Sequence, residues 1–320
     1  MDSAVPVPAQ AVEALRRSRS HALMHTLMLL ATFCWAANIV AVKEGLKGFG
    51  PLALALLRIS GAWVLFTILF FGRRNRPPLR LTGREWLTMA LVAMTGVTFN
   101  QLFFIGGLAH SSVAHAGLIV ALGPVMVLVL SCLLRLEALT VLKFVGMLVS
   151  FGGVAVLTTG KVGHGNSGQL LGDMLLLAGS GVFAGYTILM KEIAGRYDAV
   201  TLNALAYTIG VVGMIPFGAY SLVDVRWVSI PPHAWLGLAY AIVFGSVVPY
   251  LILAVAINEL TASRVAAFSY IQPVIATGLG IWLLGEGLTL KIILGGMLIL
   301  LGVYLTERER GEEQGVGSRE

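Results

Sequence analysis

The sequence has 320 residues, of which 57% are hydrophobic and 12% are charged, and its formal net charge is +6. Because a soluble domain usually carries about 25% charged residues, this composition excludes an ordinary soluble protein and makes lipid the expected solvent. The excess of positive charge does not indicate nucleic acid, since the cytoplasmic loops of membrane proteins collect Lys and Arg.

Ten apolar segments follow one another along the chain, each near the length of about 20 residues that crosses a bilayer. Residues 1–21 precede them and are predicted to be a flexible cytoplasmic tail, because this stretch is polar and contains proline. No small-residue cleavage site stands out, so the first apolar segment is predicted to be a transmembrane helix and not a cleaved signal peptide. The predicted spans are 22–42, 51–72, 86–108, 113–134, 141–159, 170–190, 201–222, 235–257, 264–284 and 289–306. The charged residues 307–320 are predicted to be a disordered cytoplasmic tail.

The distribution of Lys and Arg predicts which ends of the spans face the cytoplasm. If the N-terminus is cytoplasmic, the segments on that side hold 16 of the 22 Lys and Arg residues, those on the other side hold 5, and Arg58 lies within a span. Cytoplasmic segments of membrane proteins carry such an excess. Both termini and the loop 73–85 are therefore predicted to be cytoplasmic, with an even number of crossings.

The two halves of the chain repeat each other. The matching positions are 32–43 with 180–191 at an offset of 148 and, at an offset of 149, Gly96 with Gly245, Pro124 with Pro273, Glu137 with Glu286, Gly146 with Gly295 and Gly153 with Gly302. We predict one repeat over 22–159 and a second over 170–306, joined by the linker 160–169. Five spans in each repeat force the second to enter from the opposite side, and inverted repeats are a usual feature of secondary transporters.

Over about 22–306 the chain resembles the drug/metabolite transporter superfamily in its ten-helix form, with two EamA repeats. The residues that carry the resemblance are Trp35, Asn38, Pro51, Arg58, Pro124, Glu137, Gly146, Gly153, Pro273, Glu286, Gly295 and Gly302. It implies an all-α integral membrane protein of ten helices, located in the bacterial inner membrane. The second repeat departs from the pattern at Phe183 and Tyr186 and has no arginine equivalent to Arg58. The superfamily carries amino acids, other metabolites, drugs and cations, so the substrate does not follow.

Polar and aromatic side chains inside the spans predict a central substrate cavity between the two halves. The predicted lining is Trp35, Asn38, Arg58, Asn100, Gln101, Tyr186, Tyr207, Tyr250, Tyr270 and Gln272. Amides in hydrocarbon need partners, so each of them either faces this cavity or joins neighbouring helices. Arg58 either binds a substrate carboxylate or bonds helix-end carbonyls. The whole set suits a small polar metabolite with an apolar part.

A second set of residues is predicted to act in hinges or gates. Its members are Pro124, Pro273, His110, His115, Glu137 and Glu286, with Glu259 and Arg264 as further gate contacts. The prolines free a backbone carbonyl within a span, which gives either a hinge or a static kink. The two glutamates either titrate and couple proton movement to gating, or stabilise helix ends. Gly146 with Gly153, and Gly295 with Gly302, are predicted to let spans five and ten pack closely.

Other functional classes find less support in the sequence. The spans carry no histidines at metal-ligand spacing, no second intramembrane aspartate beside Asp173 and no phosphate-binding loop, so neither an enzyme nor a bound metal or cofactor is expected. Cys34 and Cys132 are interpreted as small buried hydrophobes. We predict a secondary transporter that exports a small amphiphilic metabolite such as an amino acid, driven by the substrate's own gradient or by protons or another coupling ion. A multidrug or lipophilic-cation exporter is the alternative, and an intramembrane enzyme a distant one.

Overall fold

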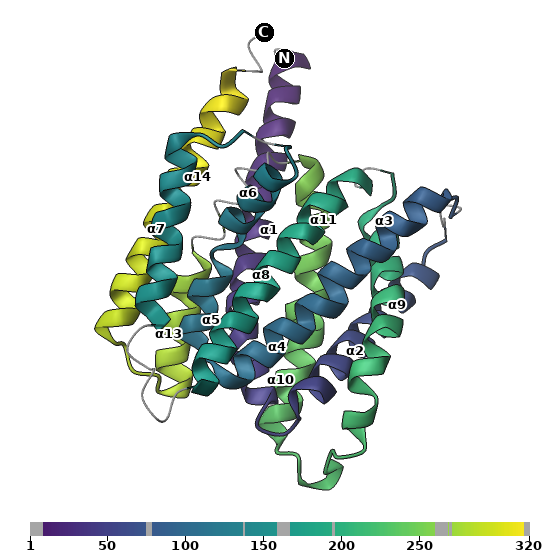
Figure 1. Ribbon diagram of the computed structural model, residues 1–320. Helices are drawn as coiled ribbons and strands as arrows, with labels where there is room; N and C mark the ends of the chain where they lie inside the picture. The colour runs from purple at the N-terminus through teal and green to yellow at the C-terminus, as the bar shows by residue number, and fades with distance from the viewer. Residues whose placement is uncertain are drawn as a thin grey trace, which may run out of the picture.

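The fold is taken from a computed structural model that describes residues 9–74, 79–136, 138–158, 167–193, 196–259, 268 and 271–316. All regular elements in this part of the chain are helical (Figure 1). The first half contains α1 (Ala9–Gly45), α2 (Pro51–Phe71), α3 (Gly83–Ala93), the π-helical turn η1 (Met94–Phe99), α4 (Asn100–His110), α5 (Val113–Val120), α6 (Gly123–Leu133) and α7 (Val141–Thr158). The second half contains α8 (Ser167–Ile193), α9 (Ala199–Gly218), the 3-10 turns η2 (Tyr220–Leu222) and η3 (Trp227–Ser229), α10 (Pro232–Ile242), the π-helical turn η4 (Val243–Val247), α11 (Val248–Glu259), α13 (Gln272–Leu284) and α14 (Leu290–Val316).

Seven helical segments in the described residues are long and apolar enough to cross a membrane, and three further apolar helices are shorter. The shorter ones are Val141–Leu157, Gln272–Leu284 and Leu290–Leu305. They fall within the predicted fifth, ninth and tenth spans, so the all-α, multi-pass membrane fold is confirmed. Two tail predictions were wrong, because the backbone of 9–21 continues α1 and that of 307–316 continues α14.

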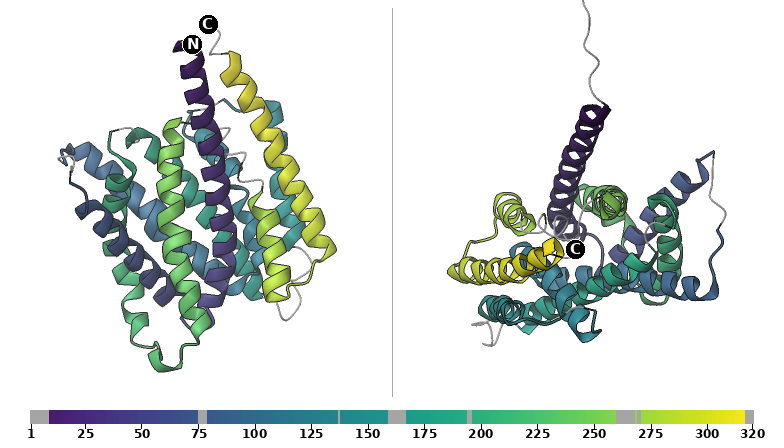
Figure 2. Two further views of the ribbon diagram at one scale, coloured as in Figure 1. Left: turned by 180° about the vertical axis from the view of Figure 1, so that it is seen from behind. Right: turned by 90° about the horizontal axis from the view of Figure 1, so that it is seen from above.

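Both termini lie at the same end of the helical bundle, where α1 and α14 extend beyond the other helices (Figures 1 and 2). We call this the terminal end and the opposite one the distal end. Successive spans run in alternating directions between them, as an even number of crossings requires. With five spans in each half, α1 starts at the terminal end and α8 starts at the distal end, so the two halves are inverted relative to each other.

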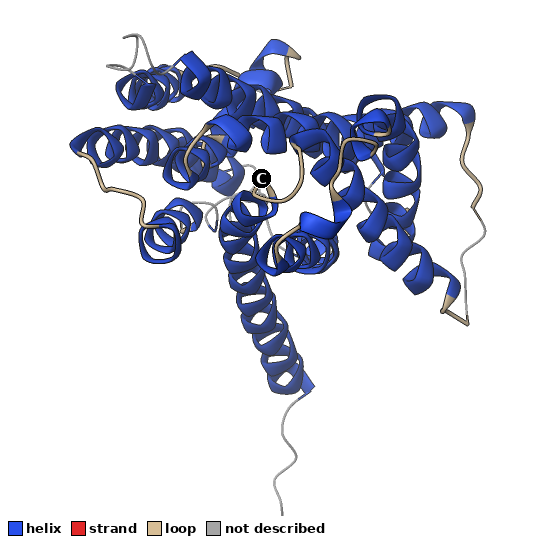
Figure 3. Ribbon diagram, turned by 90° about the horizontal axis from the view of Figure 1, so that it is seen from below, coloured by secondary structure: helices blue, strands red, loops and turns tan. Residues whose placement is uncertain are grey.

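Helix packing follows the internal repeat. Helix α1 of the first half packs on α10 of the second, and the equivalent α8 packs on α4. Helix α2 packs on its own counterpart α9 at one edge of the bundle, and α7 packs on its counterpart α14 at the other edge (Figures 1 and 3). Each half therefore completes its core with the other half.

Glycine lets α7 and α14 approach closely, as the sequence predicted. A Cβ added to Gly153 would lie 2.7 Å from the carbonyl oxygen of Gly295, and one added to Gly302 would lie 2.4 Å from that of Gly146. Real Cβ atoms are not found at such distances from a backbone oxygen. Small residues at these positions provide the close backbone contact that holds helices together in lipid, where the hydrophobic effect gives little drive.

Candidate functional site

The third and eighth spans are interrupted at matching points by the π-helical turns η1 and η4. Gly96 in η1 and Gly245 in η4 are the pair of glycines that the repeat alignment matches at an offset of 149. A π-turn inserts one extra residue into an α-helix and is often found at functional sites. The two turns place glycine backbone opposite the helices of the other half.

Around η4 the neighbouring side chains are polar. A Cβ on Gly245 would lie 2.1 Å from Asn38 Oδ1 and 3.0 Å from Arg58 Nη2, so both side chains pack directly against this glycine. Arg58 Nη2 donates a hydrogen bond to the Gly245 carbonyl oxygen at 3.0 Å, and Arg58 Nε donates one to Ser246 Oγ at 3.1 Å. With only 2% of its surface exposed, the Arg58 guanidinium is buried in the interior of the bundle.

Three buried polar atoms in the described part of the chain have no hydrogen-bond partner: Asn38 Oδ1, Arg58 Nη1 and Gln101 Oε1. No described carboxylate lies within ion-pair distance of Arg58. Leaving a buried donor or acceptor unpaired costs about 1–3 kcal/mol, and more for a charged group. The interior therefore holds one buried cation without an anion, together with two acceptors that lack donors.

Around η1 the neighbouring side chains are aromatic. A Cβ on Gly96 would lie 2.2 Å from Cδ2 of Tyr186, so this ring lies flat against the turn. The ring centroid of Tyr250 lies 6.2 Å from that of Tyr186, 6.0 Å from that of Tyr207 and 6.1 Å from that of Trp35. The Tyr250 hydroxyl donates to the Gly96 carbonyl oxygen at 3.5 Å. Tyr207 lies beside both Arg58 and Ser246, which joins the aromatic group to the polar one.

The structure brings together part of the predicted cavity lining. We call the residues around η1 and η4 the central cluster: Trp35, Asn38, Arg58, Tyr186, Tyr207 and Tyr250, with Gln101 buried on α4. Asn100 is half-buried and donates instead to the Gly179 carbonyl oxygen of α8 at 3.3 Å, which joins two helices. Gln272 is buried in the first turn of α13, outside the described contacts that link the cluster. Tyr270 lies outside the described residues.

Two residues that bind Arg58 were missed by the sequence reasoning. Gly245 contributes its carbonyl oxygen to Arg58, and Ser246 contributes its hydroxyl. Gly245 had been noted only as a marker of the repeat. Two signals in the sequence could have indicated the site: the glycine that recurs as Gly96 and Gly245, and the serine that directly follows Gly245. A lipid-facing helix needs neither a recurring glycine nor a serine.

At the distal end, one basic and one acidic side chain stabilise the helix ends that meet between α4 and α5. Lys43 Nζ donates to the carbonyl oxygens of Leu108 at 2.8 Å and Ser111 at 2.5 Å, at the C-terminus of α4. Glu286 accepts from the backbone N–H groups of Val113 at 2.7 Å and Ala114 at 3.0 Å, at the N-terminus of α5. Each charge has the sign that the adjoining helix dipole favours. Of the two roles left open for Glu286, the structure shows the stabilisation of a helix end.

His115, predicted as a gate residue, belongs to a buried network next to this break. Asp173 accepts from the Ser111 hydroxyl at 2.5 Å, and its other oxygen lies 2.9 Å from His115 Nδ1. The side chains of His115 and Asp173 are only 4% and 1% exposed. The network links the α4–α5 break to α8 of the other half. His110 ends α4 and is exposed.

Pro124 and Pro273, which the internal repeat matches at an offset of 149, both lie in the first turn of a helix. Helix α5 ends at Val120, and α6 begins at Gly123 with Pro124 in its first turn. Helix α13 begins at Gln272 with Pro273 in its first turn. Pro124 thus lies at an interruption of the fourth span, as a proline without an N–H favours. Glu137 and Arg264 lie outside the described residues, as does the side chain of Glu259.

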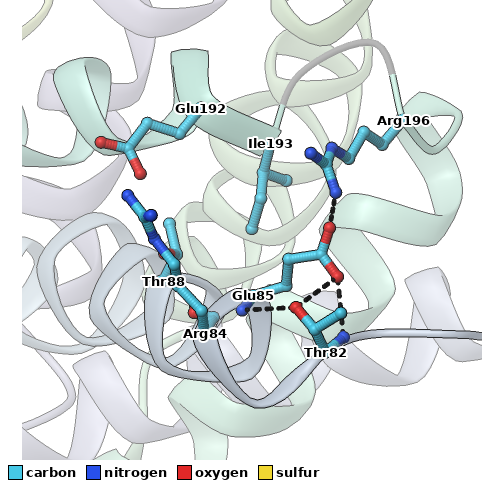
Figure 4. A pocket seen from close by; sticks show the side chains of 7 residues that line it. All are labelled: Thr82, Arg84, Glu85, Thr88, Glu192, Ile193 and Arg196. Carbon is cyan, nitrogen blue, oxygen red and sulfur yellow. Dashed lines mark hydrogen bonds and ion pairs between the residues drawn. The ribbon is translucent and has the colours of Figure 1, made fainter.

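A surface pocket of about 550 Å³ lies at the terminal end, between the start of α3 and the end of α8 (Figure 4). Its lining is Thr82, Arg84, Glu85, Thr88, Glu192, Ile193 and Arg196. Glu85 forms an ion pair with Arg196, and it caps α3 by accepting from the backbone N–H of Thr82.

Near the pocket, Asp198 caps α9 and forms an ion pair with Arg73. Burial alone would raise the pKa of Asp198, but hydrogen bonds from Thr201 and Arg73 outweigh it, so the pKa of Asp198 is lowered. These contacts tie loops together, so the pocket is separate from the central cluster.

Comparison with known proteins relates the whole described fold to transporters. The model of the EamA-like transporter family matches residues 22–159 and 170–308. An uncharacterized transporter of Archaeoglobus fulgidus is 29% identical over 88% of this chain and 96% of that protein. A protein of Streptantibioticus cattleyicolor, named a probable terminal-alkyne amino-acid exporter, is 25% identical over 88% of this chain and 92% of that protein. A crystal structure with 17% identity superposes with a TM-score of 0.59, over 88% of this chain and 97% of that one.

Proposed function

This chain belongs to the EamA-like transporter family and is a multi-pass membrane transporter, and we propose that it exports a small zwitterionic metabolite of the amino-acid type across the cytoplasmic membrane by alternating access. The proposal rests on Arg58, which is buried without a described anion and leaves Nη1 without a hydrogen-bond partner. A carboxylate would supply the missing anion to Nη1, in the charge-assisted geometry that guanidinium groups favour. An ammonium group would supply the missing donor to Asn38 Oδ1 or Gln101 Oε1.

The inverted halves support alternating access. Two similar halves of opposite orientation can exchange conformations around a fixed central site, which opens that site to one side and then to the other. The central cluster lies where the halves meet, at η1 and η4. The family relative named as an amino-acid exporter supports the same substrate class.

A direct test replaces Arg58 with Gln. We expect uptake of a radiolabelled amino acid into proteoliposomes to fall by at least about 30-fold, because truncating a buried hydrogen-bonded charge pair costs about 2–5 kcal/mol. Arg58→Lys should recover part of the activity, since it restores the charge without the planar fork. Arg226→Gln, at an exposed arginine of a distal loop, is the matched control. Normal transport by a correctly inserted Arg58→Gln protein would show that Arg58 is structural.

The Arg58→Gln variant also distinguishes the proposed amino-acid exporter from the alternative, an exporter of lipophilic cations. Tyrosine ring faces can hold a lipophilic cation, which would favour a multidrug exporter. Arg58 beside Tyr207 repels such a cargo, so an exporter of cations should work better after Arg58→Gln. Recovery of the substrate unchanged from the liposomes also excludes an intramembrane enzyme.

We further propose that both termini face the cytoplasm, on the strength of the Lys and Arg count. In a protein with Cys34 and Cys132 replaced by Ser, an impermeant thiol reagent applied to intact cells should label Gly163→Cys and leave Arg76→Cys unlabelled. After the cells are opened, both variants should react, which controls for reagent access. Labelling of Arg76→Cys alone in intact cells would show that the orientation is the reverse of the one proposed.

A further inference from the structure

Among the described residues, three buried side chains each leave one polar atom without a hydrogen-bond partner, and all three belong to the first repeat. Asn38 lies on α1, Arg58 on α2 and Gln101 on α4. Their counterparts in the second repeat, at offsets of 148, 149 and 149, are Tyr186, Tyr207 and Tyr250. Every position that leaves a polar atom unpaired in one half is thus a tyrosine in the other half.

The three tyrosines form one continuous aromatic group. Tyr250 lies between Tyr186 and Tyr207, at centroid distances of 6.2 Å and 6.0 Å, in tilted and edge-to-face arrangements. The exposed fractions are only 4% for Tyr186, 2% for Tyr207 and 5% for Tyr250. The group adjoins the polar side chains at Tyr207, beside Arg58. The aromatic group and the polar side chains Asn38 and Arg58 therefore adjoin each other in the interior.

We propose that the two repeats divide the substrate between them: Asn38, Arg58 and Gln101 bind its charged head group, and Tyr186, Tyr207 and Tyr250 form the subsite for its apolar side chain. This inference rests on the function proposed above and adds which residues select among amino acids. Ring faces contact flat and apolar groups and offer no charge, so the second repeat sets the size and shape of side chain that the transporter accepts.

Tyr186 is the residue best placed to limit side-chain size. Its ring is held on one face by the Gly96 backbone, where not even a Cβ would fit, and it stacks on Phe183 at 5.2 Å. A ring confined in this way cannot move aside for a larger substrate. Removing it enlarges the subsite without touching Asn38, Arg58 or Gln101.

The experiment compares Tyr186→Ala with the wild-type protein in proteoliposomes. Unlabelled alanine, leucine, phenylalanine and tryptophan compete with the best labelled amino acid, and apparent affinities are measured for each. We expect the affinity ratio of the largest to the smallest effective competitor to rise by about tenfold, which is the scale on which apolar pockets discriminate by size. Tyr186→Phe should keep the wild-type ratio, because it retains the ring.

Controls separate a change of selectivity from a loss of fold. Phe49→Ala removes an equally buried ring that packs on Trp227 and Trp235 at the distal end, and it should leave the ratio unchanged. If Tyr186→Ala does not insert, Tyr186→Leu gives the same test with a smaller cavity. Equal weakening of every competitor in a folded variant contradicts the subsite. A wild-type protein that binds none of the amino acids overturns the proposed function itself, and the inference with it.

Discussion

Replacing Gly245 with Ala should reduce transport by more than about tenfold, although it adds a single methyl group. The new Cβ would lie 2.1 Å from Asn38 Oδ1 and 3.0 Å from Arg58 Nη2. Overpacking of a filled interior costs about 1–3 kcal/mol, and here two of the three side chains that would hold the substrate's head group, Asn38 and Arg58, must move. Initial rates of counterflow in proteoliposomes measure the effect.

Two other glycines make this prediction specific. Gly96→Ala places a Cβ 2.2 Å from the Tyr186 ring, so it should change side-chain selectivity while the dependence on a substrate carboxylate remains. Gly278 lies on α13 with nothing within 4 Å of an added Cβ, so Gly278→Ala should transport normally. Equal losses from Gly245→Ala and Gly278→Ala would mean that helix flexibility, and not the central cluster, limits transport.

Asp173→Ala should lower the melting temperature of the detergent-purified protein by roughly 10 °C. The change removes the acceptor of the Ser111 hydroxyl and the nearer of two partners of His115 Nδ1, the other being Gln169 at 3.4 Å; Ser111 and His115 are both buried. Stranding buried polar groups costs about 3 kcal/mol when their partner is lost. Asp224→Ala, at an exposed loop carboxylate, should leave the melting temperature unchanged.

A double-mutant cycle tests whether the loss comes from the pair. If His115 and Asp173 stabilise each other, the double variant His115→Ala/Asp173→Ala should be less destabilised than the sum of the single variants, because neither group is left unpaired. Strict additivity would show that each residue is held by other contacts and that the distal network is not one unit.

The sequence predicted the architecture well because the bilayer constrains it strongly. Length, apolarity and the alternation of Lys and Arg located the spans, and the matching of 32–43 with 180–191 revealed the repeat. The ends of the first and last helices were wrong. Polar composition predicts a tail, but helix formation continues as long as backbone hydrogen bonds can be made, and α1 extends back to Ala9.

The site could be predicted only in part. Arg58 and the tyrosines stood out because ionisable and hydroxyl groups are rare in hydrocarbon. Asp173 was considered only in rejecting an intramembrane enzyme. Its partners Ser111 and His115 lie about 60 residues away, and no local pattern reveals such a pairing. The π-turns were not predicted either, since the sequences around Gly96 and Gly245 continue the helical spans without a proline in the turns themselves.

At each π-turn a side chain of one half contacts a glycine of the other half: Arg58 contacts Gly245, and Tyr186 contacts Gly96. These contacts explain why two copies of the first half could not replace the natural pair of halves. Tyr207, the counterpart of Arg58, lies beside Arg58 itself. A dimer of two first halves would therefore bring two guanidinium groups together in a medium of low dielectric, where like charges repel strongly. The single chain avoids this repulsion, because it places one arginine and one tyrosine at the two equivalent positions in every molecule.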